Sequence, residues 1–199
     1  QVKGGRWANL CQPARVVSPI LSDVIGDAVD AIASGPTAPD PTTFADALAV
    51  LDRYDLRTAV APAVRTVLEQ GQAGRIPETP KEGQPVFARV RNVIVGSNRL
   101  AIQAVQNGAT RRGLAAAVLS ETLSGEARDV GAWLAGRARE AQKSLPAGGA
   151  VCLIAGGETT VTVRGQGQGG RSQELALAFA LAVDGTEGIT LLSAGTDGT

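Results

Sequence analysis

The feature that most constrains this 199-residue chain is the alternation of apolar and helix-forming segments in its second half. Apolar runs typical of strands lie at 93–95, 114–119, 151–155 and 189–193, with an alternating Thr/Val run at 159–164. Between them lie segments typical of helices, at 98–112, 125–143 and 171–183. Such alternation predicts an α/β layered fold with a mainly parallel sheet, in which ligands bind beyond the carboxyl ends of the strands.

The first half shows a weaker version of the same pattern. We expect a strand at 15–21, a long Gly/Pro/Asp-rich loop at 22–41 and a helix capped by Thr42 or Thr43. A second helix is expected at 62–70, with Gly71 just past its end. The stretch 71–85 is polar and holds three prolines, so it predicts a linker between domains 1–85 and 86–199.

Composition excludes several classes of function. The chain has no His, which removes Ser-His-Asp and Cys-His nucleophiles, His-ligated zinc and imidazole acid–base catalysis. Lys plus Arg and Asp plus Glu are 19 each and aromatics are 3%, so nothing predicts a nucleic-acid partner or a membrane surface. The two Cys residues form no CxxC pair, and no apolar run could span a bilayer, so we expect a cytoplasmic protein.

The strongest local signal is the run Arg164-Gly165-Gln166-Gly167-Gln168-Gly169-Gly170-Arg171. Glycines let backbone N–H groups approach an anion, a following helix adds its N-terminal partial charge, and two flanking arginines suit phosphate or carboxylate. The run is formally a GxGxxG, but a dinucleotide site requires an acid near the end of the next strand; Asp184 and Glu187 precede that strand, and Asp197 follows it on a Gly-rich turn of its own. A Walker P-loop is excluded, because the chain has no Gly-Lys dipeptide. The sequence therefore favours a phosphate site over a plain connection.

Other candidates lie where strands are expected to end. Gly156 and Gly157 present Glu158, which suits a metal or a hydroxyl ligand, and 193–199 interleaves Thr196 and Asp197 with glycines. Asp23 directly follows the first strand and is as well explained by a turn as by a site. Ser97 and Asn98 precede a helix, with Asn98 predicted chiefly as its cap. Glu126, Arg128 and Asp129 are interpreted as a solvated helix face with pairing three residues apart.

These segments together resemble the glycerate 2-kinases of the MOFRL family. The resemblance rests on Lys3-Gly4-Gly5-Arg6, Ser22-Asp23-Val24, Ile32-Ala33-Ser34-Gly35-Pro36-Thr37, Gly96-Ser97-Asn98 and Ser124-Gly125-Glu126-Ala127-Arg128. It continues through Gly156-Gly157-Glu158-Thr159-Thr160, Gly169-Gly170-Arg171 and Gly195-Thr196-Asp197-Gly198-Thr199. It spans almost the whole chain and departs at Ser172 and Ala28, where the family usually has Asn and a second acid.

The resemblance implies ATP-dependent phosphorylation of D-glycerate at its 2-hydroxyl, with Mg2+, in a cleft between two Rossmann-like α/β domains that are both incomplete here. Catalytic residues would be Arg171, Asp23 and Asp197. Substrate and nucleotide would contact Ser34, Gly35, Ser97, Asn98, Gly156, Gly157, Glu158, Arg164, Gly165, Gly167, Gly169, Gly170 and Thr196, and the metal would lie at Asp197 and Glu158. The roles of the three acids are not separated.

Two other interpretations stay open. One is an NAD(P)H-dependent hydroxypyruvate reductase, which the formal GxGxxG and an older family name favour; the other is a non-catalytic ligand-binding fragment. Family members also carry an upstream Gly-Lys motif that places a Lys in the active site, and this chain has none. We therefore expect the chain to be an internal portion of a longer enzyme, with little or no kinase activity by itself.

Overall fold

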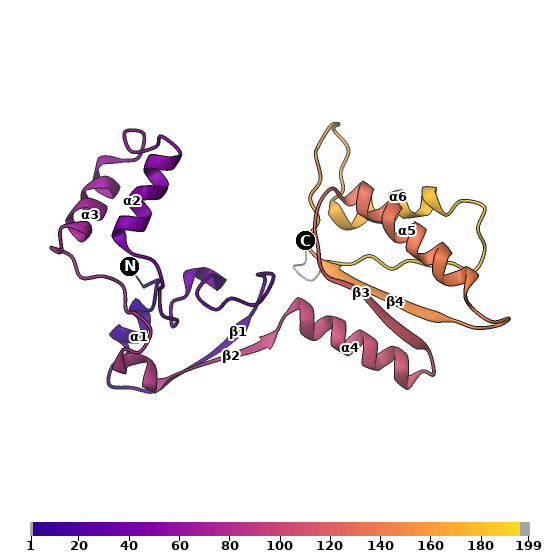
Figure 1. Ribbon diagram of the computed structural model, residues 1–199, viewed down its shortest axis with the longest axis horizontal. Coiled ribbons are helices and arrows are strands. Elements are labelled where there is room, and N and C mark those ends of the chain that lie inside the picture. The colour runs from indigo at the N-terminus through magenta and orange to yellow at the C-terminus, as the bar shows by residue number, and fades with distance from the viewer. Residues whose placement is uncertain (1, 196–199) are drawn as a thin grey trace. The chain divides into compact units, whose positions relative to one another are not determined.

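The computed structural model describes residues 2–195 (Figure 1) and divides them into two compact units, Gln1–Gly96 and Ser97–Thr199. The division between the two units falls after Gly96, further along the chain than the domain boundary predicted after residue 85. Strand β2 (Val90–Gly96) belongs to the first unit because it pairs with a strand of that unit. The boundary at 85 and the cleft between domains stay predictions. Each unit is described by itself below.

The first unit is built on two parallel strands. Strand β1 (Val16–Leu21) pairs with β2 from Val16 opposite Val90 to Ile20 opposite Ile94, which confirms the first predicted strand and lengthens the second. A short helix, α1 (Arg6–Leu10), precedes β1, and the 3-10 turns η1 (Ile32–Ser34) and η2 (Pro85–Arg89) interrupt the segments between the strands. Buried Thr37 anchors the long loop to β2, because its hydroxyl donates to Asn92 Oδ1 at 2.6 Å.

Two helices complete this unit. Helix α2 (Phe44–Arg53) begins after Thr43, whose hydroxyl accepts the Asp46 N–H while the Asp46 carboxylate accepts the Thr43 N–H, so the predicted Thr43 cap is confirmed. Helix α3 (Pro62–Gln72) runs past Gly71, so the prediction that Gly71 ends it was wrong. The reason is packing: a Cβ on Gly71 would lie 2.3 Å from the Phe44 ring, so the glycine serves a helix contact instead of a cap.

The second unit has a three-layer order. Strands β3 (Ala115–Leu123) and β4 (Val151–Gly157) pair in parallel from Ala115 opposite Val151. In Figure 1, helix α4 (Asn98–Arg111) lies on one side of this pair, and α5 (Ala127–Lys143) and α6 (Arg171–Ala182) lie on the other. Ala127, Val130 and Leu175 form a core cluster between α5 and α6. The α/β prediction is confirmed, with one incomplete sheet in each unit.

Two predicted strands are absent from the described residues. The Thr/Val run at 159–164 forms only a single bridge, between Thr160 and Glu126, because it is held by the start of α5 and not by a strand. The run 189–193 forms no strand, and its Leu191 packs instead against the α5–α6 cluster. Over residues 2–195, no helix is long and apolar enough to cross a membrane.

Candidate functional site

The carboxyl ends of β3 and β4 form the base of the candidate site. The pairing of β3 with β4 becomes irregular after Val118 and again after Ser120, and it closes with Leu123 opposite Gly157. Gly157 has φ +151°, and a Cβ there would lie 2.2 Å from the Leu123 nitrogen. Only glycine fits at this end of β4, which then turns and presents Glu158 on the surface.

The start of α4 lies against the same edge. The Ser97 hydroxyl accepts the Leu100 N–H at 3.3 Å, so Ser97 is the cap, and the prediction that Asn98 caps this helix was wrong. The Asn98 amide instead donates to the Glu121 carbonyl at 2.7 Å, because Asn98 faces the end of β3. A Cβ on Gly156 would lie 2.2 Å from Asn98 Oδ1, so Asn98 and Gly156 are brought together.

Arg171 is the most constrained of the predicted catalytic residues. It begins α6, and its guanidinium donates to Glu158 Oε1 at 2.5 Å, with both side chains partly exposed. Two residues predicted separately from sequence therefore lie in direct contact, one at the end of β4 and one at the start of α6. A guanidinium has five N–H donors, so it can hold a carboxylate and an anionic ligand together.

The glycine-rich segment between them is an exposed loop. Residues 163–170 are all exposed and belong to no helix or strand, and in Figure 1 the segment projects as a narrow orange loop beyond α5 and α6. A Cβ on Gly165, Gly167 or Gly170 would meet nothing within 4 Å. These glycines are therefore not required by packing, and the open space around them leaves room for a bound anion to approach the backbone.

Two contacts near the ends of this loop were not predicted. Glu126 accepts the Thr162 hydroxyl at 2.5 Å and the Thr162 N–H at 3.1 Å, and Arg128 donates to Glu174 at 2.8 Å. Hydrogen bonds from the Thr162 side chain and backbone lower the pKa of Glu126, and the charges of Arg128 and Arg164 add to this effect. Arg128 and Asp129 are exposed as predicted, but the predicted pairing three residues apart was wrong for Glu126 and Arg128, because both reach segments far away in the sequence.

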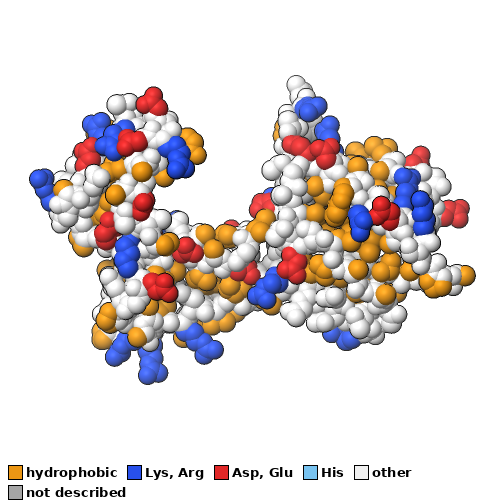
Figure 2. Space-filling view, viewed as in Figure 1, with side chains coloured by type: hydrophobic (Ala, Val, Ile, Leu, Met, Phe, Trp, Pro, Cys, Tyr) orange, Lys and Arg blue, Asp and Glu red, His pale blue; other side chains and the backbone are white. Residues whose placement is uncertain are grey.

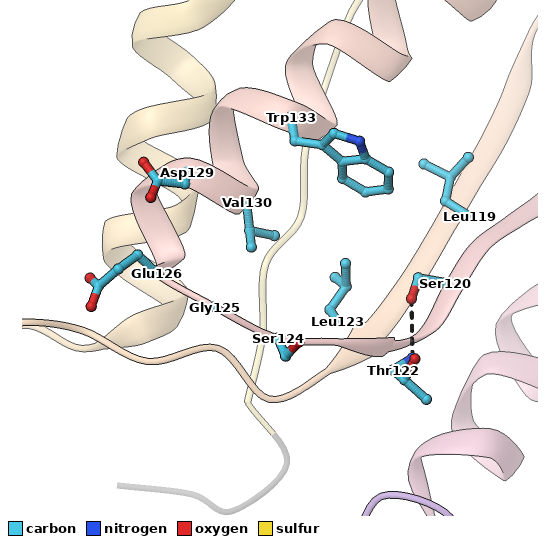
Figure 3. Close-up of a pocket in the computed structure, with 10 residues that line it drawn as sticks. All are labelled: Leu119, Ser120, Thr122, Leu123, Ser124, Gly125, Glu126, Asp129, Val130 and Trp133. Carbon is cyan, nitrogen blue, oxygen red and sulfur yellow. Dashed lines mark hydrogen bonds between the residues drawn. The ribbon is translucent and has the colours of Figure 1, made fainter.

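An open cavity of about 500 Å³ adjoins the site between β3 and α5. Figure 3 shows Leu119, Leu123, Val130 and Trp133 lining its apolar part, while the Glu126 carboxylate points away from Trp133. The Ser120 hydroxyl accepts the Thr122 N–H at 3.1 Å at the irregular end of β3. In Figure 2, apolar side chains gather on this face of the second unit. None of the predicted site residues within 2–195 lines the cavity.

The first unit carries three predicted site residues. Asp23 is exposed and follows β1. Ala33, Ser34 and Gly35 have φ of 50°, 60° and 54°, a left-handed turn that costs energy at the two non-glycine positions. The N–H groups of Gly4 and Gly5 hold this turn by donating to the Ser34 and Gly35 carbonyls. Strained turns of this kind concentrate at functional sites, in keeping with the predicted role of Ser34 and Gly35.

The predicted metal ligands are described only in part. Thr196 and Asp197 lie outside the described residues. Within residues 2–195, no group of three His, Cys, Asp or Glu side chains is arranged to hold a metal ion. Glu158 is the predicted metal ligand that can be placed, and it is paired with Arg171.

Comparisons with known proteins cover both units. Residues 1–69 match a domain of unknown function (DUF4147), and residues 151–199 match the MOFRL family. A D-glycerate 2-kinase of Thermotoga maritima is 42% identical over 200 residues, which cover 100% of this chain and 45% of that protein. An Agrobacterium vitis protein, named only provisionally as a hydroxypyruvate reductase, is 42% identical over 99% of this chain and 49% of its own length.

A crystal structure of glycerate kinase from Thermotoga maritima matches the fold. Its TM-score is 0.78 at 39% identity, and the match covers 94% of this chain and 42% of that one. The chain therefore spans about half the length of the curated relatives named above.

Proposed function

Because the chain is a homologue of the glycerate 2-kinases along its whole length, we propose that its protein phosphorylates D-glycerate at the 2-hydroxyl, with ATP as donor. The observation that carries this proposal is the contact of Glu158 with Arg171, at the point where the glycine-rich loop enters α6. At this point the Arg171 guanidinium, which can bind an anion through two N–H groups, lies beside a helix N-terminus and a glycine-rich backbone. These are the elements that bind transferring phosphoryl groups.

The proposed reaction needs no His. The 2-hydroxyl oxygen forms a bond to the γ-phosphorus, the bond from that phosphorus to the β–γ bridging oxygen breaks, and ADP leaves. The hydroxyl proton passes to a carboxylate, for which Asp23, Glu158 and Asp197 are the candidates. Catalysis of such a transfer is mostly positioning and charge stabilisation. We assign Arg171 to a phosphate or to the glycerate carboxylate, and Glu158 to holding the guanidinium in place.

The described residues fit a magnesium ion that arrives bound to the nucleotide better than a metal ion held permanently by the protein. Mg2+ usually binds one or two carboxylates and completes its shell with water and substrate phosphates. Glu158 supplies one such carboxylate, and no three-ligand group exists among residues 2–195. Magnesium would supply charge neutralisation of the phosphates, with Glu158 and Asp197 as its proposed protein ligands.

The remaining predicted residues are proposed to bind substrate or nucleotide. Ser97, Asn98, Gly156 and Gly157 are assigned to substrate or nucleotide contacts at the strand ends, and Arg164, Gly165, Gly167, Gly169 and Gly170 to the phosphates. Ser34, Gly35 and Thr196 complete the proposed binding set. The protein is also proposed to be cytoplasmic, because its two widely separated Cys residues form no CxxC pair and suit a reducing compartment.

The reductase interpretation is less well supported. A dinucleotide fingerprint places its glycines directly after a buried strand. Here β4 ends at Gly157, and the run before Gly165 forms only one bridge to Glu126. Hydroxypyruvate with NADH should therefore give no change in nicotinamide absorbance, whereas D-glycerate with ATP should yield ADP and 2-phosphoglycerate.

The decisive variant is Arg171→Ala in the intact native protein. Loss of a charge-stabilising donor in a closed site should remove roughly 2–4 kcal/mol of transition-state stabilisation, measured as kcat/KM for glycerate. Arg137→Ala is the matched control, because Arg137 makes an exposed pair with Glu140 on α5. Unchanged kcat/KM in Arg171→Ala would show that the loop is only a connection.

A further inference from the structure

The glycine-rich loop has little packing of its own. Residues 163–170 are exposed, and three of the glycines border open space. A flexible loop binds an anion weakly unless its ends are fixed, because ordering its backbone on binding costs conformational entropy. The contacts at the two ends of the loop therefore decide how well its N–H groups are placed.

The first end is held by Glu126. Its carboxylate accepts both the hydroxyl and the N–H of Thr162. The backbone adds two bonds beside it, from the Ala127 N–H to the Thr160 carbonyl and from the Thr160 N–H to the Gly125 carbonyl. The segment that enters the loop is thus fixed to the start of α5 at residues 160 and 162.

The Glu126 side chain makes no hydrogen bond that caps its own helix, α5. Glu126 is the N-cap residue of α5, yet its side chain makes no capping hydrogen bond there. The side chains that ordinarily accept an N–H of the first turn from this position are the shorter ones of Asp, Asn, Ser and Thr. Here both oxygens go instead to Thr162, 36 residues along the chain. This geometry favours a role toward the loop over a role in the helix.

The second end of the loop is held from the same turn of α5. Arg128 donates to Glu174 in the first turns of α6, and Arg171 at the start of α6 is held by Glu158. Glu126 and Arg128 lie two residues apart, so a single turn of α5 contacts the chain before and after the loop. The charge of Arg164, inside the loop, also acts on Glu126.

We propose that Glu126 is a positioning residue, which fixes Thr162 so that the glycine-rich loop presents its N–H groups and Arg164 to the phosphates of the nucleotide. This inference rests on the proposed function only for the identity of the anion. The loop and its two fixed ends belong to the second unit alone.

The test compares single variants of the intact native protein. Thr162→Val removes the hydroxyl donor at nearly constant shape, Thr162→Ser retains it, and Glu126→Gln weakens the acceptor without changing its size. Thr160→Val is the matched control, because the bonds that hold Thr160 in this segment come from its backbone. Thermal melts of all four variants identify any that fails to fold. If Thr162→Val does not fold, Glu126→Gln takes its place in the comparison.

Two readouts do not depend on turnover. The dissociation constant of ATP with magnesium is measured by calorimetry, and the rate of trypsin cleavage after Arg164 is followed by mass spectrometry. Loss of a hydrogen bond to a charged group should weaken ATP binding about tenfold in Thr162→Val and speed cleavage by a similar factor. Thr162→Ser and Thr160→Val should stay near the native values, and glycerate KM should change little in every variant.

The outcomes separate this inference from the proposed function. Unchanged ATP binding in Thr162→Val would overturn the positioning role, whether or not cleavage speeds up. ATP binding without phosphorylation of glycerate by the native protein would overturn the proposed function alone. Failure of the native protein to bind ATP would overturn both.

Discussion

At the scale of single residues, Glu126 shows how a local environment sets a charge. Two hydrogen bonds from Thr162 favour the carboxylate over the acid, with the hydroxyl bond as the larger effect. Because the folded-state pKa lies below the ordinary value of 4.5, this contact stabilises the fold above pH 4.5. The stabilisation is lost as pH falls through the folded-state pKa.

The first prediction concerns that pKa. Thr162→Val should raise the pKa of Glu126 toward 4.5, because the strongest donor to the carboxylate is removed. The measurement is an NMR titration of the Glu126 carboxyl carbon. Thr160→Val should leave the titration where it is in the native protein. An unshifted curve in Thr162→Val would mean that the hydroxyl does not bond to Glu126 in solution.

At the scale of elements, the α5–α6 contact depends on one glycine. A Cβ on Gly131 would lie 2.5 Å from the Leu175 carbonyl oxygen, which is backbone and cannot turn aside. Gly131→Ala should therefore destabilise the fold by about 1–3 kcal/mol, through overpacking. Gly136→Ala, in the same helix with nothing within 4 Å, should stabilise it by about 0.5–1 kcal/mol. Urea unfolding of both variants measures the difference, and equal shifts would contradict this packing.

The start of α2 gives a second prediction for an element. Thr43 and Asp46 form a reciprocal cap, so Thr43→Ala should cost about 1 kcal/mol of unfolding free energy. Thr43→Ser retains the hydroxyl and should lie close to the native protein. Denaturant midpoints at constant m-value give the comparison. A stability of Thr43→Ala equal to that of the serine variant would show that the cap contributes nothing.

Patterns among neighbouring residues predicted most helices and strands, but they did not predict the contacts between segments far apart in the sequence. The Thr43 cap and the strand at 15–21 follow from capping and from apolar spacing, which depend on neighbours in sequence. Gly71 was misassigned because its role depends on the Phe44 ring of another helix. The Glu126–Thr162 contact was missed because its partners lie 36 residues apart, and only folding brings them together. At 189–193, packing of Leu191 on the α5–α6 cluster replaces the predicted strand.

At the scale of the whole molecule, the first unit leaves apolar sheet surface uncovered. On β1 and β2, Val17 is 66%, Leu21 80% and Val95 58% exposed, although parallel sheets are normally covered on both faces. Among residues 2–195 each sheet has two strands, and the chain spans 45% of the Thermotoga maritima relative. The 199 residues are therefore a smaller structure than the relatives that share their sequence.

The last prediction follows from this difference. The 199-residue polypeptide by itself should not phosphorylate glycerate, because a two-stranded sheet positions a loop less rigidly than a full one. The Gly-Lys motif that the resemblance implies for the active site is also absent from these residues. The measurement is ADP formation from ATP with D-glycerate, and the Thermotoga maritima D-glycerate 2-kinase is the positive control. ADP formation above the blank, abolished by Arg171→Ala, would contradict the prediction and place a complete catalytic centre within these residues.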